Sequence, residues 1–300
     1  FMFDRKRNFY VSAIIGGTPG IAVGMGWALK RKKSDQRVWC FVGDGIEDTG
    51  HFAEAVRYVD GWDLPVTFVI EDDGMAVNAS KKSRWGKDED IQWPPCVIRY
   101  HYTKTRPHIR TGNFAPLDVM KSVMKTDEEY FPLLEERPVN LNIEKTDLSF
   151  KNAVTLAMTE MGNDGNIFIG YSIVPGDAMG TLENVNLDQK IETPVAENLM
   201  VGLAIGMSFE GFRPVVYFER HDFMLVAADA IVNHVDKIER ISHGEFKCPV
   251  ILKTVVDDST LFYSGPTHEQ DFTEGFRTLV DFPVLDPQSA DEVLAAYRYA

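Results

Sequence analysis

Two carboxylates in the first half of the chain lie where they could hold a metal ion. Asp44 stands between two glycines directly after an apolar run, and Asp73 follows the next apolar run. Magnesium that binds a diphosphate takes one or two carboxylates or carbonyls together with phosphate oxygens and water. A glycine turn also brings backbone N–H groups close to an anion near the start of the following helix. The predicted diphosphate-binding residues are Gly43, Asp44, Gly45, Ile46, Asp73 and Met75, with Asp44, Asp73 and the Met75 carbonyl as metal ligands.

A Gly-Asp-Gly turn is also a common loop sequence, so its surroundings decide its meaning. A strand before the turn, a helix after it and a second carboxylate at the next strand end favour the diphosphate site. A dinucleotide-binding site is the natural alternative. The glycines between residues 16 and 26 do not give the full dinucleotide fingerprint with an acidic residue after it, which disfavours that alternative.

A single carboxylate begins the most apolar segment of the second half. Glu197 follows Thr193 and Pro194 and precedes a Gly/Ala-rich apolar run that reaches about Phe209. Burial raises the pKa of a carboxyl group and allows it to share a proton with a bound ring. The alternative is that the helix dipole alone favours a glutamate in the first turn of a helix capped by Thr193.

The elements that must position these residues alternate as in an α/β protein. We expect strands at 38–42, 65–70, 167–171, 214–218 and 249–252, and helices at 52–59, 117–124, 150–161, 193–209, 223–241 and 289–297. In a parallel sheet, a strand-helix-strand unit puts both strand ends at one edge, where ligands usually bind. The predicted fold is therefore α/β with two similar domains, each a mainly parallel sheet flanked by helices.

Composition limits the class of protein. The chain has 300 residues, 44% of them hydrophobic, so it can bury two domains of ordinary size. The formal charge of −14 disfavours non-specific binding to nucleic acid or anionic membranes. No apolar run reaches the roughly 20 residues that cross a bilayer, and the three cysteines lack metal-ligand spacing. We expect a soluble, cytoplasmic protein.

The pattern of apolar residues loosens in the middle of the chain. We expect a first domain at 1–112 that is incomplete at its N-terminal end, a linker at 113–147 and a second domain at 148–300. The chain begins without an initiator methionine and ends inside a helical pattern. We therefore expect a fragment, or one piece of a split enzyme.

With these residues in view, the chain resembles the thiamine diphosphate enzymes of the 2-oxo acid dehydrogenase E1 and transketolase family. In that family a Gly-Asp-Gly turn precedes, at a fixed distance, a strand end with a metal-binding asparagine, and here segments 43–45 and 71–73 take these places. Residues 8–80 resemble the diphosphate domain of an E1 alpha chain, and residues 149–300 resemble the pyrimidine domain of an E1 beta chain. The resemblance implies thiamine diphosphate and Mg²⁺ as cofactors.

The resemblance also implies roles for three side chains in the second half. Glu197 matches the glutamate that activates the cofactor through its pyrimidine ring, and Phe223 matches the aromatic ring that packs on the aminopyrimidine. His268, in a Ser-Gly-Pro-Thr-His segment, matches the histidine that borders the substrate and could donate a proton. Without the resemblance, Phe223 is a core residue and His268 a loop histidine. His221 is a further, weaker candidate.

Two departures from the family pattern stand out. Asp73 replaces the metal-binding asparagine, and the histidine that many E1 alpha chains carry after an Asn-Phe-Tyr segment is absent here after Tyr10. We also expect this chain to lack the third domain that usually follows in the family.

The activity implied is decarboxylation of a 2-oxo acid and transfer of the acyl or hydroxyalkyl unit to an acceptor, such as a lipoyl group on a partner E2 protein. One alternative is a transketolase-like transfer of two carbons between sugars, and another is an inactive cofactor-binding subunit that serves assembly or regulation. We expect the diphosphate domain of one chain to meet the pyrimidine domain of another, in a homodimer or larger oligomer with its active site at the interface.

Overall fold

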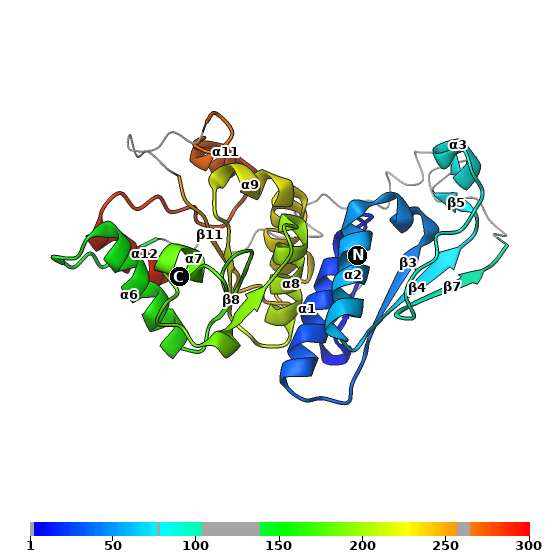
Figure 1. The fold of residues 1–300 in the computed structure, drawn as a ribbon, viewed down its shortest axis with the longest axis horizontal. Coiled ribbons are helices and arrows are strands. Elements are labelled where there is room, and N and C mark those ends of the chain that lie inside the picture. Colours follow the sequence, from blue (N-terminus) through cyan, green and yellow to red (C-terminus); the bar gives the residue numbers. More distant parts are fainter. Residues whose placement is uncertain (1–2, 77–78, 104–138, 257–264) are drawn as a thin grey trace, which may run out of the picture.

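Two parallel sheets organise the protein (Figure 1). The structure is a computed structural model that describes residues 3–76, 79–103, 139–256 and 265–300. The first sheet has the strand order β3-β4-β7 and the second has the order β11-β10-β8-β9, with parallel pairing throughout both sheets. Helices flank the two sheets. The predicted α/β fold with parallel sheets is confirmed.

The N-terminal part, residues 3–103, holds the first sheet. Its main elements are α1 (Gly17–Arg31), β3 (Val38–Gly43), α2 (Gly50–Trp62), β4 (Val66–Asp72), α3 (Lys81–Trp85) and β7 (Val97–His101). Its short elements are β1 (Phe3–Asp4), η1 (Arg5–Arg7), β2 (Phe9–Tyr10), η2 (Asp44–Asp48), β5 (Met75–Ala76) and β6 (Ala79–Ser80). The two predicted strands and the helix between them are present. The sequence analysis assigned neither α1 nor β7.

The C-terminal part, residues 139–300, holds the second sheet. Its strands are β8 (Ile167–Gly170), β9 (Lys190–Glu192), β10 (Pro214–Tyr217) and β11 (Ile251–Lys253). Its helices are α6 (Phe150–Asn163), α7 (Asp177–Gly180), η3 (Leu187–Gln189), α8 (Glu197–Phe209), α9 (His221–Met224), η4 (Leu225–Ala227), η5 (Ala230–Val235), α10 (Ile238–Ile241), α11 (Thr273–Leu279) and α12 (Ala290–Tyr299).

Two predicted helices of the C-terminal part differ from the structure. The helix expected at 193–209 begins only at Glu197, and residues 193–196 before it are not helical. The helix expected at 223–241 is divided into four short pieces from α9 to α10, one of which is a π-helix. The helix expected at 117–124 lies outside the described residues.

Strand β3 places the Gly-Asp-Gly turn at the sheet edge. Its side chains alternate, with Val38, Cys40 and Val42 buried in the core. Strand β4 pairs with it in parallel through Gly43↔Glu71, so the carboxyl ends of both strands lie side by side. After a 3-10 turn, the Oγ1 of Thr49 accepts the N–H of Phe52 and caps α2.

Helices α1 and α8 join the two parts of the chain (Figure 1). Gly20 lies against Gly202, and Gly24 lies against Gly206, so the two helices run parallel with their N-termini at the same end. A Cβ on Gly24 would lie 2.0 Å from the carbonyl oxygen of Leu203. Only glycine permits this backbone contact.

Helix α8 is buried on every side. All residues from 198 to 209 are buried between α1 and the second sheet. A helix that is apolar all round belongs either to a protein core or to a membrane. Among the described residues, no helix is both long and apolar enough to span a bilayer. Helix α8 is therefore the central helix of a core shared by both parts.

A lysine lies buried on the other face of the second sheet. Lys253 is 7% exposed, and its Nζ lies 4.0 Å from the centroid of the Tyr217 ring on the neighbouring strand. Among the described residues, no hydrogen bond or ion pair compensates its amine. Burial lowers the pKa of Lys253 to about 7.

We expect Lys253→Met to raise the free energy of unfolding by roughly 2–5 kcal/mol at pH 6.5. In the unfolded chain the lysine has its ordinary pKa of 10.5. Burial of the charged amine therefore destabilises the folded protein most below pH 7, and this destabilisation disappears as the pH rises toward 10.5. Urea denaturation at pH 6.5 and 9.5 measures the difference. Lys151→Met, on the exposed surface of α6, is the control. An equal gain for Lys253→Met at both pH values would contradict the prediction.

Candidate cofactor site

A cleft of about 350 Å³ lies at the carboxyl end of the first sheet. All six residues predicted to bind the diphosphate and its metal ion line this one cleft: Gly43, Asp44, Gly45, Ile46, Asp73 and Met75. The segment that leads into α1 also lines the cleft, through residues 12–16 and Thr18. The strand register explains the grouping, because β3 and β4 end at the same edge.

Asp44 provides a buried and only partly compensated carboxylate in this cleft. The residue is 2% exposed, and its Oδ2 has no hydrogen-bond partner among the described residues. Arg84 forms an ion pair with it, in which Nη2 lies 3.7 Å from that oxygen. Burial and the charges of Asp72 and Asp73 raise the pKa of Asp44, although Arg84 offsets part of this effect. A bound cation would stabilise the ionised carboxylate.

Asp73 lines the cleft from a tight turn after β4. Its Oδ1 accepts the N–H of Met75 at 3.0 Å, and Gly74 between them has a φ of 77°, which favours glycine. This turn fixes the position of the Asp73 carboxylate and of the Met75 backbone. The turn therefore places two oxygen donors in the lining of the cleft.

The cleft residues fit a magnesium-bound diphosphate. The donor set consists of oxygens, which Mg²⁺ prefers. A Cβ on Gly43 would meet no atom within 4 Å, so the backbone there faces open space that an anion can approach. The buried Oδ2 of Asp44 is an oxygen ligand that lacks a hydrogen-bond partner. Asp73 would add one more negative charge than an asparagine, which a divalent cation can balance.

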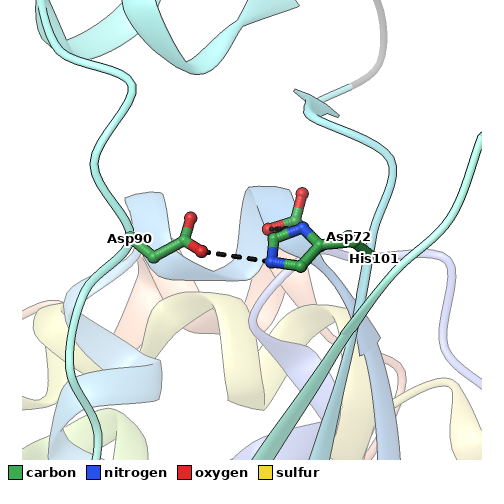
Figure 2. A group of neighbouring side chains, drawn as sticks. All are labelled: Asp72, Asp90 and His101. Carbon is green, nitrogen blue, oxygen red and sulfur yellow. Dashed lines mark ion pairs between the residues drawn. The ribbon is translucent and has the colours of Figure 1, made fainter.

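A second acidic group lies nearby but is already neutralised. Asp72, Asp90 and His101 bring their ligand atoms within 4.8 Å of one another. Figure 2 shows these three side chains grouped together. Arg99 Nη1 lies 2.5 Å from an Asp72 oxygen, and Lys81 Nζ lies 2.5 Å from Asp90. Although burial opposes ionisation, these cations hold the pKa of Asp72 below its ordinary value. The group is an ion-pair cluster that supports the sheet edge.

Glu197 lies at the same end of the α1–α8 pair as the cleft. Gly20 of α1 lies against Gly202, and a Cβ on Gly20 would lie 3.9 Å from the carbonyl oxygen of Asn198. Glu197, the first residue of α8, therefore lies at the end of the pair where Gly16 lines the cleft. A Cβ on Gly16 would lie 3.3 Å from the Nδ1 of His51. Burial raises the pKa of Glu54, one turn further along α2; His51 lowers it in part, and the charge of Glu197 raises it further. Glu197 itself is half-buried.

The structure thus pairs the two parts of a single chain. The sequence analysis expected the diphosphate domain of one chain to meet the pyrimidine domain of another. Here α1 packs on α8 of the same chain, because their four glycines allow backbone contact. One chain therefore brings Asp44 and Glu197 to the same end of this helix pair.

Phe223 and His268 contact each other. Their ring centroids lie 5.4 Å apart in an edge-to-face arrangement, and both residues are half-buried. The Nδ1 of His268 also lies 3.1 Å from Oγ1 of Thr267. Neither residue lines the cleft at the first sheet. Their proposed contacts with the pyrimidine and the substrate therefore remain predictions.

His221 has a structural role. It is buried, and its Nδ1 accepts the N–H of Phe272 at 3.2 Å. Its ring stacks on Phe276 with centroids 5.6 Å apart. Burial lowers its pKa, although Asp271 opposes this shift.

Sequence reasoning missed four polar residues around the cleft: Ser12, His51, Glu54 and His234. Glu54 and His51 lie three residues apart on α2, so helical spacing could have placed them on one face. Ser12 and His234 are 222 residues apart, and no local pattern connects them.

Family models and known proteins match both parts of the chain. A model described as the pyrimidine binding domain of transketolase matches residues 146–300, and a dehydrogenase E1 component model matches residues 1–89. The pyruvate dehydrogenase E1 component subunit beta of Rickettsia conorii is 32% identical over 113 residues, which cover 38% of this chain and 34% of that protein. The mitochondrial counterpart from Saccharomyces cerevisiae is 27% identical over 160 residues, covering 51% and 43%.

A solved structure agrees on the fold. A transketolase from Campylobacter jejuni superposes with a TM-score of 0.58 at 12% identity, covering 89% of this chain and 56% of that chain. The curated relatives named above are matched over less than half of their own length. The pyrimidine-binding model alone matches more than half of this chain. The resemblance seen in the sequence is confirmed: the chain belongs to the family of thiamine diphosphate-dependent 2-oxo acid dehydrogenase E1 components and transketolases.

Proposed function

We propose that this chain binds thiamine diphosphate with Mg²⁺ and takes part in the decarboxylation of a 2-oxo acid. Gly43, Asp44, Gly45, Ile46, Asp73 and Met75 would hold the diphosphate and its metal ion. The observation that carries the proposal is the buried Asp44 carboxylate, whose Oδ2 lacks a hydrogen-bond partner among the described residues, in a cleft at the same end of the α1–α8 pair as Glu197.

The side chains of this protein have distinct tasks in that reaction. When bound, thiamine diphosphate supplies the nucleophilic carbon and the electron sink that decarboxylation requires. Glu197 would hold a proton at the pyrimidine nitrogen, and Phe223 would stack on the pyrimidine ring. His268 would donate a proton to the substrate oxygen or orient the substrate carboxylate.

Glu54 gives Glu197 a second carboxyl group nearby. Burial and the charge of Glu197 raise the pKa of Glu54, with His51 opposing in part, and Glu54 Oε2 has no hydrogen-bond partner among the described residues. Burial favours the protonated form of Glu54. Glu54 can therefore keep a proton near the predicted position of the pyrimidine ring.

Calorimetric titration with thiamine diphosphate, with and without Mg²⁺, tests the proposal. We expect saturable binding that requires the metal ion. A ferricyanide-linked screen of 2-oxo acids should then show turnover with at least one of them. Turnover of ketose sugars alone would favour the transketolase-like alternative. Cofactor binding without any turnover would identify an assembly or regulatory subunit, and absence of binding would overturn the proposal.

We expect Asp44→Asn to weaken Mg²⁺-dependent cofactor binding by roughly 30-fold or more, because a metal ligand and its charge are lost. The same change should raise the thermal midpoint of the cofactor-free protein, since it removes a buried carboxylate without a hydrogen-bond partner at Oδ2. Calorimetry and thermal denaturation measure the two effects. Asp88→Asn, at an exposed site, is the control. A lower midpoint with unchanged binding would assign Asp44 a structural role.

The acceptor and the assembly belong to the same proposal. In an E1-type reaction, the acyl unit would pass to a lipoyl group on a partner E2 protein. A homodimer or larger oligomer is proposed from the family relationship. Because α1 and α8 of one chain already pack together, we expect such an assembly to add contacts around the site while each chain keeps its own Asp44 and Glu197.

A further inference from the structure

A buried histidine reaches from the C-terminal part to the wall of the cleft. His234 lies in η5 and is 1% exposed. Its Nε2 lies 3.0 Å from Oγ of Ser12, and Ser12 lines the same cleft as Asp44. The contact connects this wall to the part of the chain that carries Glu197.

The imidazole ring also packs directly on the first residue of α1. A Cβ on Gly17 would lie 2.3 Å from His234 Nε2, so the ring occupies the space that any side chain at Gly17 would need. Gly16, just before the helix, has a φ of 93° and lines the cleft. His234 therefore supports the turn that connects the cleft-lining residues 12–16 to α1.

The Ser12 hydroxyl transmits this support to the backbone of the loop. Its Oγ accepts the N–H of Ile14 at 3.1 Å, which leaves its own O–H free to donate to the imidazole. Burial lowers the pKa of His234, so the neutral ring with a free acceptor nitrogen is favoured at neutral pH. The hydrogen bonds then run from Ile14 to Ser12 and from Ser12 to His234.

We propose that His234 is a positioning residue for the cofactor, acting through Ser12 to hold residues 12–17 in the conformation that forms this wall of the Asp44 cleft. The inference rests on the proposed function. It makes cofactor binding depend on a hydrogen bond between the two parts of the chain, at a site outside the diphosphate turn. Mobility of this wall would lower the fraction of molecules with a formed cleft and weaken binding in proportion.

The test measures the Kd for thiamine diphosphate with Mg²⁺ by calorimetry in Ser12→Ala, His234→Ala, His234→Gln and the double alanine variant. We expect each single alanine change to weaken binding about tenfold. The double variant should be no weaker than the weaker single variant, because both changes remove the same contact. His234→Gln should recover much of the affinity, since its amide oxygen can accept the Ser12 hydroxyl.

Ser208→Ala is the matched control for stability. Ser208 is a buried serine whose Oγ donates to the carbonyl of Ile205, near the C-terminal end of α8 and far from Glu197. We expect this variant to lower the thermal midpoint and to leave the Kd unchanged. Wild-type binding with an unchanged Kd in all Ser12 and His234 variants would overturn the inference alone. Absence of binding by the wild-type protein would overturn the proposed function and the inference with it.

Discussion

Replacing Glu197 with glutamine is expected to lower turnover of the 2-oxo acid by about 10²- to 10⁴-fold, the range typical of a lost general acid–base group. The change keeps the size of the side chain and its ability to form a hydrogen bond. It removes the ionisable proton that Glu197 would hold at the pyrimidine nitrogen. Because Glu197 does not line the cleft that holds Asp44 and the diphosphate turn, we expect the cofactor Kd to change by less than about tenfold.

Exchange of the C2 hydrogen of bound thiamine diphosphate with deuterium provides a measurement that needs no substrate. We expect wild-type protein to accelerate this exchange and Glu197→Gln to lose most of the acceleration. Glu183→Gln, an exposed glutamate in the same part of the chain, is the control and should behave like the wild type. An unchanged exchange rate in Glu197→Gln would show that this carboxylate stabilises the N-terminus of the helix and does not activate the cofactor.

The first sheet and its diphosphate turn could be predicted because their signals are local. The apolar runs of β3 and β4 and the helical spacing of α2 each lie within a few residues, and parallel pairing then brings Asp44 and Asp73 to one edge. The segment between β3 and α2 was less predictable. The structure has the 3-10 turn η2 there instead of an immediate helix start, and this turn gives Asp44 and Gly45 their places in the cleft.

Helix α1 could not be assigned because glycine lowers helix propensity. The helix contains Gly20, Gly24 and Gly26, each of which costs about 1 kcal/mol relative to alanine in an isolated helix. In the folded chain this cost is offset by contact with α8, where Gly202 and Gly206 lie against Gly20 and Gly24. We call this line of glycine contacts the α1–α8 seam. The determinant is a tertiary contact between segments about 180 residues apart, which a local reading of the sequence does not contain.

The same contact explains which features of the site were anticipated. Glu197 was identified from its apolar surroundings and from resemblance, without knowledge of the helix beside it. The single-chain pairing, Glu54 beside Glu197 and the Ser12–His234 hydrogen bond all arise where the two parts meet. Residues that face each other across this seam share no spacing in the sequence. The parts of the site that were missed are therefore those made where the N-terminal and C-terminal parts of the chain meet.

We expect Gly206→Ala to destabilise the protein by roughly 3 kcal/mol or more, at the upper end of the cost of overpacking a core. The new Cβ would lie 2.0 Å from the carbonyl oxygen of Ile21 and 2.6 Å from the backbone nitrogen of Met25. Both neighbours are backbone atoms of α1, so no side chain can move aside and the helices must separate. Separation would also move Glu197 away from the cleft and weaken cofactor binding.

Thermal denaturation and calorimetry measure how much the α1–α8 contact contributes to stability and to cofactor binding. The variants are Gly206→Ala, Gly24→Ala and the double variant. Each single change forces the same two helices apart, so the double variant should lose much less than the sum of the two single losses. Gly61→Ala is the control, because a Cβ there meets no atom within 4 Å and alanine favours the helix by about 1 kcal/mol. Wild-type stability and binding in Gly206→Ala would mean that α1 and α8 do not touch through their glycines. Asp44 and Glu197 of one chain would then lack the contact that places them at one end of this helix pair.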